Sequence, residues 1–253
     1  MTPHLITLTT DFGPGSHYVA TLKGVILSLN PQATIVDLSH SIPPQDIAAG
    51  ALFWRQATQF FPPQAIHIAV VDPGVGSSRQ ILLFESSRGL FLAPDNGLGG
   101  WLADAGGPLK IRQGENRAFH GRDIFAPVAA HLSLGRHPAE VGPIIETCVR
   151  LPANRGERVG QRIEGEVIEI DSFGNLITNI SRDMLAGVPT GESCRITCDE
   201  HETFGLFTTY SDQPPMTLIA LVGSDERLEL AIVDDSAALM LGVRKGAKVT
   251  VSW

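Results

Sequence analysis

The chain has 253 residues, of which 43% are hydrophobic and 18% are charged, a composition typical of a globular protein with a sizeable core. This composition excludes a disordered chain, and the length allows one large or two small domains. The net charge of −8 and the lack of a lysine or arginine cluster argue against a nucleic-acid-binding surface, but an acidic protein can still bind a small cation.

We expect a cytoplasmic protein with no membrane segment. The N-terminus has no basic stretch followed by an apolar one, so no signal peptide is predicted. The longest apolar runs, such as residues 218–222, are far shorter than the ~20 residues that span a membrane. The three cysteines, Cys148, Cys194 and Cys198, include no closely spaced pair, which argues against a disulfide framework. Cys194 and Cys198 share one face of a predicted strand, where we expect core packing.

The first 40 residues predict a strand, a loop, a helix and a second strand. Residues 5–8 form the first strand, and a polar, glycine-bearing loop with Asp11 follows it. Apolar side chains at steps of three and four then predict one apolar helix face; they are Val19, Leu22, Ile26 and Leu29. Asn30-Pro31 ends this helix, and residues 34–38 form the next strand. The order predicts a parallel βαβ unit with Asp11 at the end of its first strand.

The middle of the N-terminal half contains a helix and a buried strand. Asp46 is a suitable N-cap for a helix through Gln59. The apolar run 65–71 predicts a buried strand that breaks at Asp72-Pro73-Gly74, and Arg79 follows beyond a loop of small residues. Because ligands bind at the carboxyl ends of strands in open α/β sheets, Asp72 and Arg79 are candidate site residues. The simpler alternative is an aspartate that stabilises its own turn and an arginine on the surface.

Two further strands, 81–84 and 90–93, are compatible with a hairpin, and we interpret Asn96-Gly97 after them as a structural turn. The stretch 119–127 leads into an alanine-rich helix that ends near Gly135. There His120 stands beside Gly121, Arg122 and Asp123 at the start of a helix, which makes it a second candidate site. The simpler explanations are that Asp123 caps the helix and Arg122 pairs with a carboxylate.

The pattern changes after residues 143–160, which we interpret as a linker. Short strands separated by turns predict a small β-barrel or sandwich, with strands at 165–170, 176–180, 194–198, 217–222, 228–233 and 248–252. Only residues 236–241 have a helical pattern.

Four long motifs occur in order along nearly the whole chain. They are Thr10-Asp11-Phe12-Gly13, Val71-Asp72-Pro73-Gly74-Val75-Gly76-Ser77 with Arg79, Phe119-His120-Gly121-Arg122-Asp123, and Ile170-Asp171 followed by Phe173-Gly174-Asn175-Leu176-Ile177-Thr178-Asn179-Ile180. Together they resemble the S-adenosyl-L-methionine (SAM) hydrolases that form adenosine, or SAM hydroxide adenosyltransferases, which are related to the SAM-dependent fluorinase and chlorinase. The resemblance implies an α/β N-terminal domain with a central, mostly parallel sheet (1–155) and a smaller C-terminal β-barrel domain (156–253).

The resemblance also implies a site and an assembly. It assigns Asp72, Arg79 and His120 to the attacking water, and Asp11 to the ribose hydroxyls. The other implied substrate contacts are Asp171 and Asn175 for the methionine amine and the nucleoside, Ser224, Glu229 and the backbone near Ile232 for the adenine, Tyr210 as an aromatic beside the adenine, and Phe119 of the third motif. Ser16 departs from the family, which has an aspartate there against the methionine part. No cofactor is implied, and SAM is expected between the N-terminal domain of one subunit and the C-terminal domain of the next in a homotrimer.

Three other functions are compatible with the sequence. Halide transfer would give 5′-halo-5′-deoxyadenosine, but the halogenases lack the Asp/Arg/His set and have a serine where this chain has Gly121. A metal-dependent hydrolase would use Asp11, His40, Asp72, His120 and Asp123, although no tight metal-ligand spacing supports it. A non-catalytic SAM or adenosine sensor is the third possibility, and Ser16 is the residue that favours it.

Overall fold

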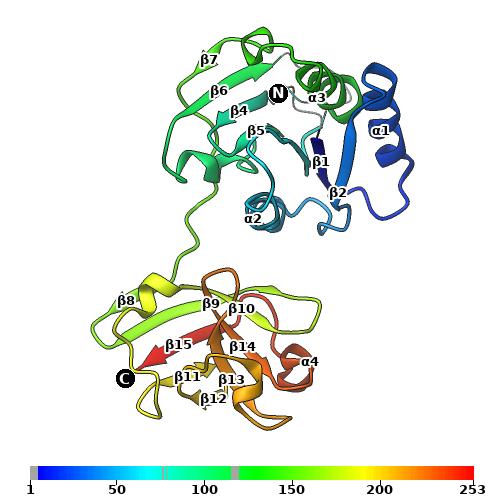
Figure 1. Cartoon of the computed structure of the whole chain (residues 1–253). Helices are drawn as coiled ribbons and strands as arrows, with labels where there is room; N and C mark the ends of the chain where they lie inside the picture. Colours follow the sequence, from blue (N-terminus) through cyan, green and yellow to red (C-terminus); the bar gives the residue numbers. More distant parts are fainter. Residues whose placement is uncertain (1–4, 76, 78, 115–119) are drawn as a thin grey trace. The chain divides into compact units, whose positions relative to one another are not determined.

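Residues 5–75, 77, 79–114 and 120–253 are described by the structure, a computed structural model. The chain divides into an N-domain, Met1–Pro152, and a C-domain, Ala153–Trp253 (Figure 1). Each domain has its own sheet and its own hydrophobic core. Within the described residues, no helix combines the length and the apolar character needed to cross a membrane.

The N-domain is built on a seven-stranded sheet with the order β2-β1-β3-β5-β4-β6-β7. Its strands are β1 (Leu5–Thr10), β2 (Thr34–Ser39), β3 (Ile66–Val70), β4 (Ile81–Ser86), β5 (Gly89–Pro94), β6 (Leu109–Gly114) and β7 (Ile144–Ile145). The pairs from β2 through β5 are parallel, and those from β5 through β7 are antiparallel. The sheet is therefore mixed.

The prediction of a mostly parallel sheet is thus wrong for half of it. Only Ser87 and Arg88 lie between β4 and β5, and so short a connection joins antiparallel strands, because a parallel pair needs a crossover of a dozen or more residues. The hairpin predicted at this place is confirmed. Strand β6 then extends the antiparallel half by pairing with β4, and the sequence had not revealed it.

Helices cover both faces of the N-domain sheet. The helices are α1 (His17–Leu29), α2 (Ile47–Thr58) and α3 (Ala126–Ser133), and α3 follows the π-helical segment η2 (His120–Phe125). Figure 1 shows α1 and α3 next to each other, and they share one core with Ile66, Ile68 and Val70 of β3. On the other face, Trp54 of α2 packs in a second core with Ala69 and Val71. Because β3 is buried on both faces, its alternating side chains serve two cores.

The helix predictions for the N-domain are confirmed. The α1 helix ends at Leu29 with Asn30 as its C-cap, and the side chain of Asp46 caps α2 by accepting a hydrogen bond from Ala49 N at 2.9 Å. Short 3₁₀ helices are η1 (Gly100–Ala103) and η3 (Pro138–Glu140) in the N-domain and η4 (Arg182–Leu185) in the C-domain.

The C-domain is a barrel-like β-sheet. Its strands run in the order β12-β11-β15-β9-β10-β14-β13, with β8 on β9. They are β8 (Glu157–Val159), β9 (Arg162–Ile170), β10 (Leu176–Ser181), β11 (Arg195–Cys198), β12 (His201–Phe204), β13 (Leu218–Val222), β14 (Arg227–Ile232) and β15 (Lys248–Ser252), with η5 (Tyr210–Asp212) and α4 (Ala237–Leu241) between them. The two end strands approach each other, since Thr203 Oγ1 donates to the Leu218 carbonyl at 2.7 Å. Cys194 and Cys198 are fully buried in the core, as predicted.

Candidate functional site

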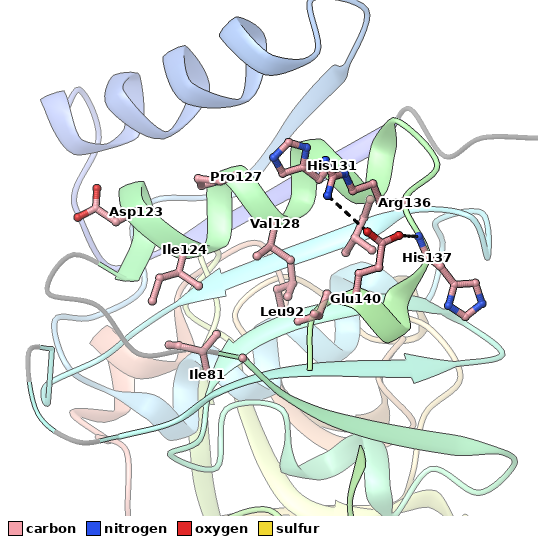
Figure 2. Close-up of a pocket in the computed structure, with 13 residues that line it drawn as sticks. Ile81, Leu92, Asp123, Ile124, Pro127, Val128, His131, Arg136, His137 and Glu140 are labelled. Carbon is pink, nitrogen blue, oxygen red and sulfur yellow. Dashed lines mark hydrogen bonds and ion pairs between the residues drawn. The ribbon is translucent and has the colours of Figure 1, made fainter. Parts of the chain in front are cut away.

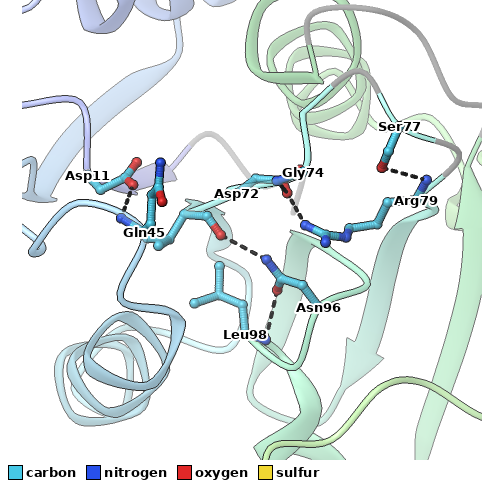
Figure 3. Close-up of polar contacts among 9 residues, drawn as sticks. Asp11, Gln45, Asp72, Gly74, Ser77, Arg79, Asn96 and Leu98 are labelled. Atoms are coloured by element: carbon cyan, nitrogen blue, oxygen red, sulfur yellow. Dashed lines mark hydrogen bonds and ion pairs between the residues drawn. The ribbon is translucent and has the colours of Figure 1, made fainter.

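Asp72 lies just beyond the end of β3, and its side chain is fully buried. Its Oδ1 accepts a hydrogen bond from Gly74 N at 2.9 Å and forms an ion pair with Arg79 (Figure 3). The first bond is the turn contact that the simpler alternative expected. The second brings in a guanidinium from seven residues away, so the sequence pair Asp72 and Arg79 is also a spatial pair. A buried carboxylate needs such a partner, because its desolvation is costly.

The guanidinium of Arg79 lies directly against Gly74. A Cβ added at Gly74 would stand 2.6–2.8 Å from three guanidinium atoms, which is closer than a real Cβ approaches its neighbours. Arg79 keeps 26% of its side chain exposed, and its backbone N–H donates to Ser77 Oγ at 3.2 Å. The small residue at position 74 therefore lets the cation approach Asp72 from the loop side while one edge stays open to a ligand.

Asp11 follows β1 at the same edge of the sheet, as predicted from the parallel βαβ unit. Its backbone N–H points to the Val70 carbonyl at 3.4 Å, and its Oδ2 accepts from Gln45 N at 2.8 Å (Figure 3). Gln45 has a left-handed backbone, with φ of 65°, which turns that N–H toward the carboxylate. The loop after Asp11 is held by a bond from Gly13 N to the His40 carbonyl at 2.8 Å.

Asn96 was interpreted from the sequence as a turn residue alone, but its side chain also reaches β3. Its Nδ2 donates to the Val71 carbonyl at 2.8 Å, and its Oδ1 accepts from Leu98 N at 3.1 Å (Figure 3). Asn96 follows β5, the parallel neighbour of β3, so the carboxyl ends of both strands lie at one edge. The sequence did not indicate this parallel pairing.

Ser16 caps helix α1. Its Oγ accepts a hydrogen bond from Tyr18 N at 3.3 Å, a normal role for serine at an N-cap. Next to it is a pocket of about 350 Å³, lined by Phe12, His17, Tyr18, Thr21, Leu22, Val75, Gly121 and Arg122. The first, second and third sequence motifs thus all contribute to one hollow in the N-domain.

The third motif is only partly described. Phe119 lies outside the described residues, and the same holds for the side chain of His120, the first residue of η2. Arg122 forms an ion pair with Asp123, with Nη2 at 2.9 Å from Oδ2, as the simpler explanation of this pair expected. The structure therefore places Asp72 and Arg79 together and leaves the third member of the implied triad as a prediction.

In the C-domain, Asp171 and Asn175 form one loop. The Oδ1 of Asp171 accepts from Phe173 N at 2.9 Å and from Asn175 N at 2.8 Å, and its Oδ2 accepts from Asn175 Nδ2 at 3.0 Å. Gly174 has φ of 87° and lies against Ser236, so a side chain there would collide with the residue that caps α4. The fourth motif thus builds a tight, carboxylate-bearing loop at the end of β9.

Tyr210 and Glu229, which the resemblance assigns separately to the adenine side, form a pair. The Tyr210 hydroxyl donates to Glu229 Oε1, and only 5% of Glu229 is exposed. Burial raises the pKa of Glu229, the negative charges of Asp171 and Asp225 raise it further, and the hydrogen bond from Tyr210 lowers it. The pKa of Tyr210 is raised by burial, by its bond to Glu229 and by the charges of Glu229 and Asp171. These mutual effects place Asp171 in the electrostatic neighbourhood of Glu229.

The same neighbourhood contains two acids that the sequence did not single out. Burial, followed by the charges of Asp225 and Asp171, raises the pKa of Glu169, and burial raises the pKa of Asp225. Ser224 lies exposed in the turn between β13 and β14, beside Asp225, and Ile232 lies buried at the end of β14. This part of the C-domain is therefore rich in acids, although the charges of Lys245 and Arg227 lower the pKa of Glu169 and that of Arg227 lowers the pKa of Asp225. A cationic ligand would stabilise the ionised acids.

A separate pocket of about 330 Å³ lies beneath α3 (Figure 2). Its apolar wall includes Ile81, Leu92 and Val128, and at one end Arg136 pairs with Glu140 at 3.4 Å. Asp123 of the third motif lines it, but none of the described residues that the resemblance assigns to the attacking water or the substrate does. Among the side chains described, there is also no group of three or more His, Cys, Asp or Glu residues arranged to hold a metal ion.

Comparisons with known proteins identify relatives along nearly the whole chain. Models of the SAM hydroxide adenosyltransferase N-terminal and C-terminal domains match residues 6–142 and 165–250. The (R)-S-adenosyl-L-methionine hydrolase of Salinispora tropica is 37% identical over 98% of this chain and 97% of its own. A fluorinase of Actinoplanes sp. is 28% identical over 98% and 97%. The crystal structure of an uncharacterized conserved protein from Thermotoga maritima aligns with a TM-score of 0.90 and 32% identity, over 98% of this chain and 100% of that one.

Proposed function

Because the chain belongs to the SAM hydroxide adenosyltransferase family, we propose that it hydrolyses SAM to adenosine and L-methionine. The observation that carries the proposal is the buried Asp72 carboxylate paired with Arg79 at the end of β3. Four relatives named as (R)-S-adenosyl-L-methionine hydrolases, at 35–38% identity, support it.

The proposed step is an in-line displacement at the ribose C5′. A C5′–O bond forms with the attacking water or hydroxide while the C5′–S bond breaks. The electron pair of that bond goes to sulfur, and methionine leaves as a neutral thioether. Hydroxide and sulfonium neutralise each other's charge in this step, so a site of low dielectric constant favours it. Holding the oxygen in line with C5′ and sulfur supplies much of the rate, since orientation alone can contribute ~7–11 kcal/mol.

Each catalytic residue has a proposed role. Arg79 and His120 place and polarise the water, and the cation of Arg79 stabilises the negative charge that develops on the attacking oxygen. Asp72 accepts or orients the proton of that water. Its Oδ1 accepts a hydrogen bond from Gly74 N at 2.9 Å, and this bond holds the carboxylate in one orientation.

The substrate contacts are proposals of the same kind. We assign Asp11 to the ribose hydroxyls and Asp171 with Asn175 to the methionine amine and the nucleoside. The adenine side would consist of Tyr210, Ser224, Glu229 and the backbone at Ile232, and Phe119 would contact the substrate as well. Ser16 lacks the charge of the family's aspartate, so its contribution to holding the methionine ammonium is weaker. The acidic character around Glu229 supports a cationic substrate.

We also propose a homotrimer in which SAM lies between the N-domain of one subunit and the C-domain of another, with no resident cofactor. Sedimentation analysis tests the assembly. A cytoplasmic location remains our expectation, and the unpaired state of Cys148, Cys194 and Cys198 is compatible with a reducing compartment.

Product analysis tests the proposed reaction. Purified protein is incubated with SAM, with and without excess chloride or bromide and with and without a chelator, and nucleosides are separated by liquid chromatography. Adenosine and methionine in every condition, lost in Asp72→Ala, would support hydrolysis. A halo-nucleoside would instead favour halide transfer, which the likeness to fluorinases makes the second candidate. Loss of activity with the chelator would indicate a metal-dependent hydrolase, and SAM binding without product would indicate a sensor.

A further inference from the structure

We infer that Asn96 is a positioning residue for Asp72, because its side-chain amide holds the backbone carbonyl that immediately precedes this aspartate. The Nδ2 of Asn96 donates to the Val71 carbonyl at 2.8 Å (Figure 3). The kinetic test of this inference rests on the proposed hydrolysis, whereas its structural test does not.

The role goes beyond that of a turn. An asparagine that only stabilises its own turn uses its side-chain oxygen, as Asn96 does when Oδ1 accepts from Leu98 N at 3.1 Å. The amide nitrogen makes a second bond to a residue 25 positions earlier in the chain. One planar amide therefore ties the turn after β5 to the end of β3, and 8% of the residue is exposed.

The bond from Asn96 satisfies a backbone carbonyl of the chain beyond the last paired residues of β3 and β5. The register of β3 with β5 runs from Ile66 opposite Leu90 to Ile68 opposite Leu92. Val71 lies three residues beyond this register and is fully buried. A buried carbonyl there needs a donor, because buried backbone groups without one are strongly disfavoured. Asn96 provides the donor and so fixes the backbone on which Asp72 stands.

Asp72 is consequently held from two sides. Asn96 fixes the peptide behind it, while Gly74 N and Arg79 hold its carboxylate in front. Neither contact alone determines where the carboxylate oxygens lie. Since a misplacement of ~1 Å in a catalytic group can cost ~100-fold in rate, the bond behind Asp72 matters for turnover and not only for folding.

Two substitutions remove the donor in different ways. Asn96→Asp keeps the shape and the oxygen that accepts from Leu98 N, but it places a carboxylate oxygen against the Val71 carbonyl. Asn96→Ser also keeps an acceptor near Leu98 N and is too short to reach Val71, and it adds no charge. The two variants share only the loss of the bond to Val71.

The chain offers a matched control in Asn30. This residue is also buried, with 2% exposed, its Nδ2 donates to Ser133 Oγ at 2.8 Å, and its Oδ1 accepts from Gln32 N at 3.1 Å. It caps the end of α1 opposite Ser16, so the 13-residue helix separates Asn30 from Ser16 by ~20 Å. Asn30→Asp therefore also replaces a buried donating amide by a carboxylate in the same domain, although its partner Ser133 Oγ, unlike a carbonyl, can donate to the new carboxylate.

The experiment measures kcat and KM for SAM and the thermal midpoint of all four proteins. We expect both Asn96 variants to lose 10- to 100-fold in kcat with KM within about 3-fold of wild type, and Asn30→Asp to lose stability with kcat within about 2-fold. Equal kcat in Asn96→Asp and Asn30→Asp, or a loss confined to KM, would overturn the inference.

Crystal structures of wild type and Asn96→Ser provide a readout that does not need turnover. The expected result is a displaced Asp72 carboxylate and an altered contact with Arg79, and an unchanged pair would overturn the inference. If wild type forms no adenosine, the proposed function fails while this structural comparison still decides the role of Asn96.

Discussion

The acidic side chains of the two domains' candidate site residues, Asp72 in the N-domain and Asp171 with Glu229 in the C-domain, are stabilised by different kinds of partner. In the N-domain, the buried carboxylate of Asp72 has an arginine as its partner. In the C-domain, the contacts described for Asp171 and Glu229 come from neutral donors, namely backbone N–H groups, an amide and a phenol. The first group is compensated in charge, whereas the second keeps negative charge that raises the pKa of Glu229 after burial has done so.

This difference separates two tasks. A compensated carboxylate can stay close to a reacting water without attracting a stray cation, and the adjacent guanidinium stabilises negative charge on the attacking oxygen. An acidic group held by neutral donors gains most from a cationic ligand, because the ligand relieves the repulsion among its members. Under the proposed function, the N-domain residues would serve the chemical step and the acids of the C-domain would bind the cationic substrate. Substitutions that change charge or hydrogen bonding in either domain test this assignment of roles.

The largest expected effect is in Arg79→Met, which removes the compensating charge. We expect kcat for adenosine formation to fall 10²- to 10³-fold, about 3–4 kcal/mol of transition-state stabilisation, with a smaller change in KM. Steady-state kinetics with chromatographic detection measures both. A kcat within 3-fold of wild type would show that Arg79 serves only the fold.

The second effect concerns the pH dependence of stability in the N-domain. His67 is fully buried in β3, its Nδ1 bonds Thr7 Oγ1 at 2.8 Å, and burial, with the charge of Arg88, lowers its pKa to about 4. Because the unfolded histidine titrates near 6.5, its contribution to stability is complete above pH 6.5 and is lost as the pH falls toward 4. The total is about 3 kcal/mol.

Urea unfolding of wild type and His67→Gln between pH 8 and pH 4 isolates this contribution, since other groups titrate alike in both proteins. The difference in the free energy of unfolding between wild type and His67→Gln should change by about 3 kcal/mol as the pH falls from 8 to 4. Amide hydrogen exchange should show the opposite sign in the C-domain, where the raised pKa values of Glu169, Asp225 and Glu229 cost stability as the pH rises through them. A loss of stability in both domains as the pH falls would contradict the difference in charge compensation between them.

An intermediate effect is expected in Gly74→Ala. The new methyl group would occupy the place of the Arg79 guanidinium, which must then move away from Asp72. We expect a loss of about 10-fold in kcat, roughly 1.4 kcal/mol, together with a lower free energy of unfolding, because the buried Asp72 carboxylate loses part of its contact with Arg79. Gly24→Ala in α1 is the control, because a methyl group there meets no atom within 4 Å. Equal kcat in both variants would show that the close approach at Gly74 is irrelevant to turnover.

The smallest effect is expected in Tyr210→Phe. The lost hydroxyl is the donor that lowers the pKa of Glu229, so this pKa rises further and less of the carboxylate is ionised at a given pH. Binding of a cationic substrate should weaken about 3-fold in acidic buffer and recover as the pH rises. Measuring KM across this range checks the shift, and a KM ratio that does not change with pH would rule out a role through Glu229.

Local signals in the sequence predicted much of the N-domain. Spacing, caps and turn residues act over a few positions, so α1, α2 and the hairpin of β4 and β5 could be located. Strand β6 pairs with β4 across more than twenty residues, and its sequence Leu109-Lys-Ile-Arg-Gln-Gly114 alternates apolar and polar residues only weakly. The extension of the antiparallel half by β6 depends on that distant pairing and was therefore not predicted.

The candidate site likewise combines residues that local signals predicted with contacts that depend on distant parts of the chain. The rule that parallel strands end at one edge was enough to bring Asp11 and Asp72 together. The second bond of Asn96 was not predictable, because it depends on how the end of β5 lies against the end of β3. In the C-domain, the resemblance pointed to Tyr210 and Glu229 separately, and their pairing was not predicted, since no spacing rule connects residues 19 positions apart on η5 and β14.

The end of β3 also restricts how the family can evolve. Val70 and Val71 offer successive carbonyls, the first to Asp11 N and the second to Asn96, and their side chains enter different cores. Inserting or deleting one residue within 66–71 would exchange both cores and both acceptors at once, since side chains alternate along a strand. The length of the strand before Asp72 is therefore constrained by both cores and both acceptors together.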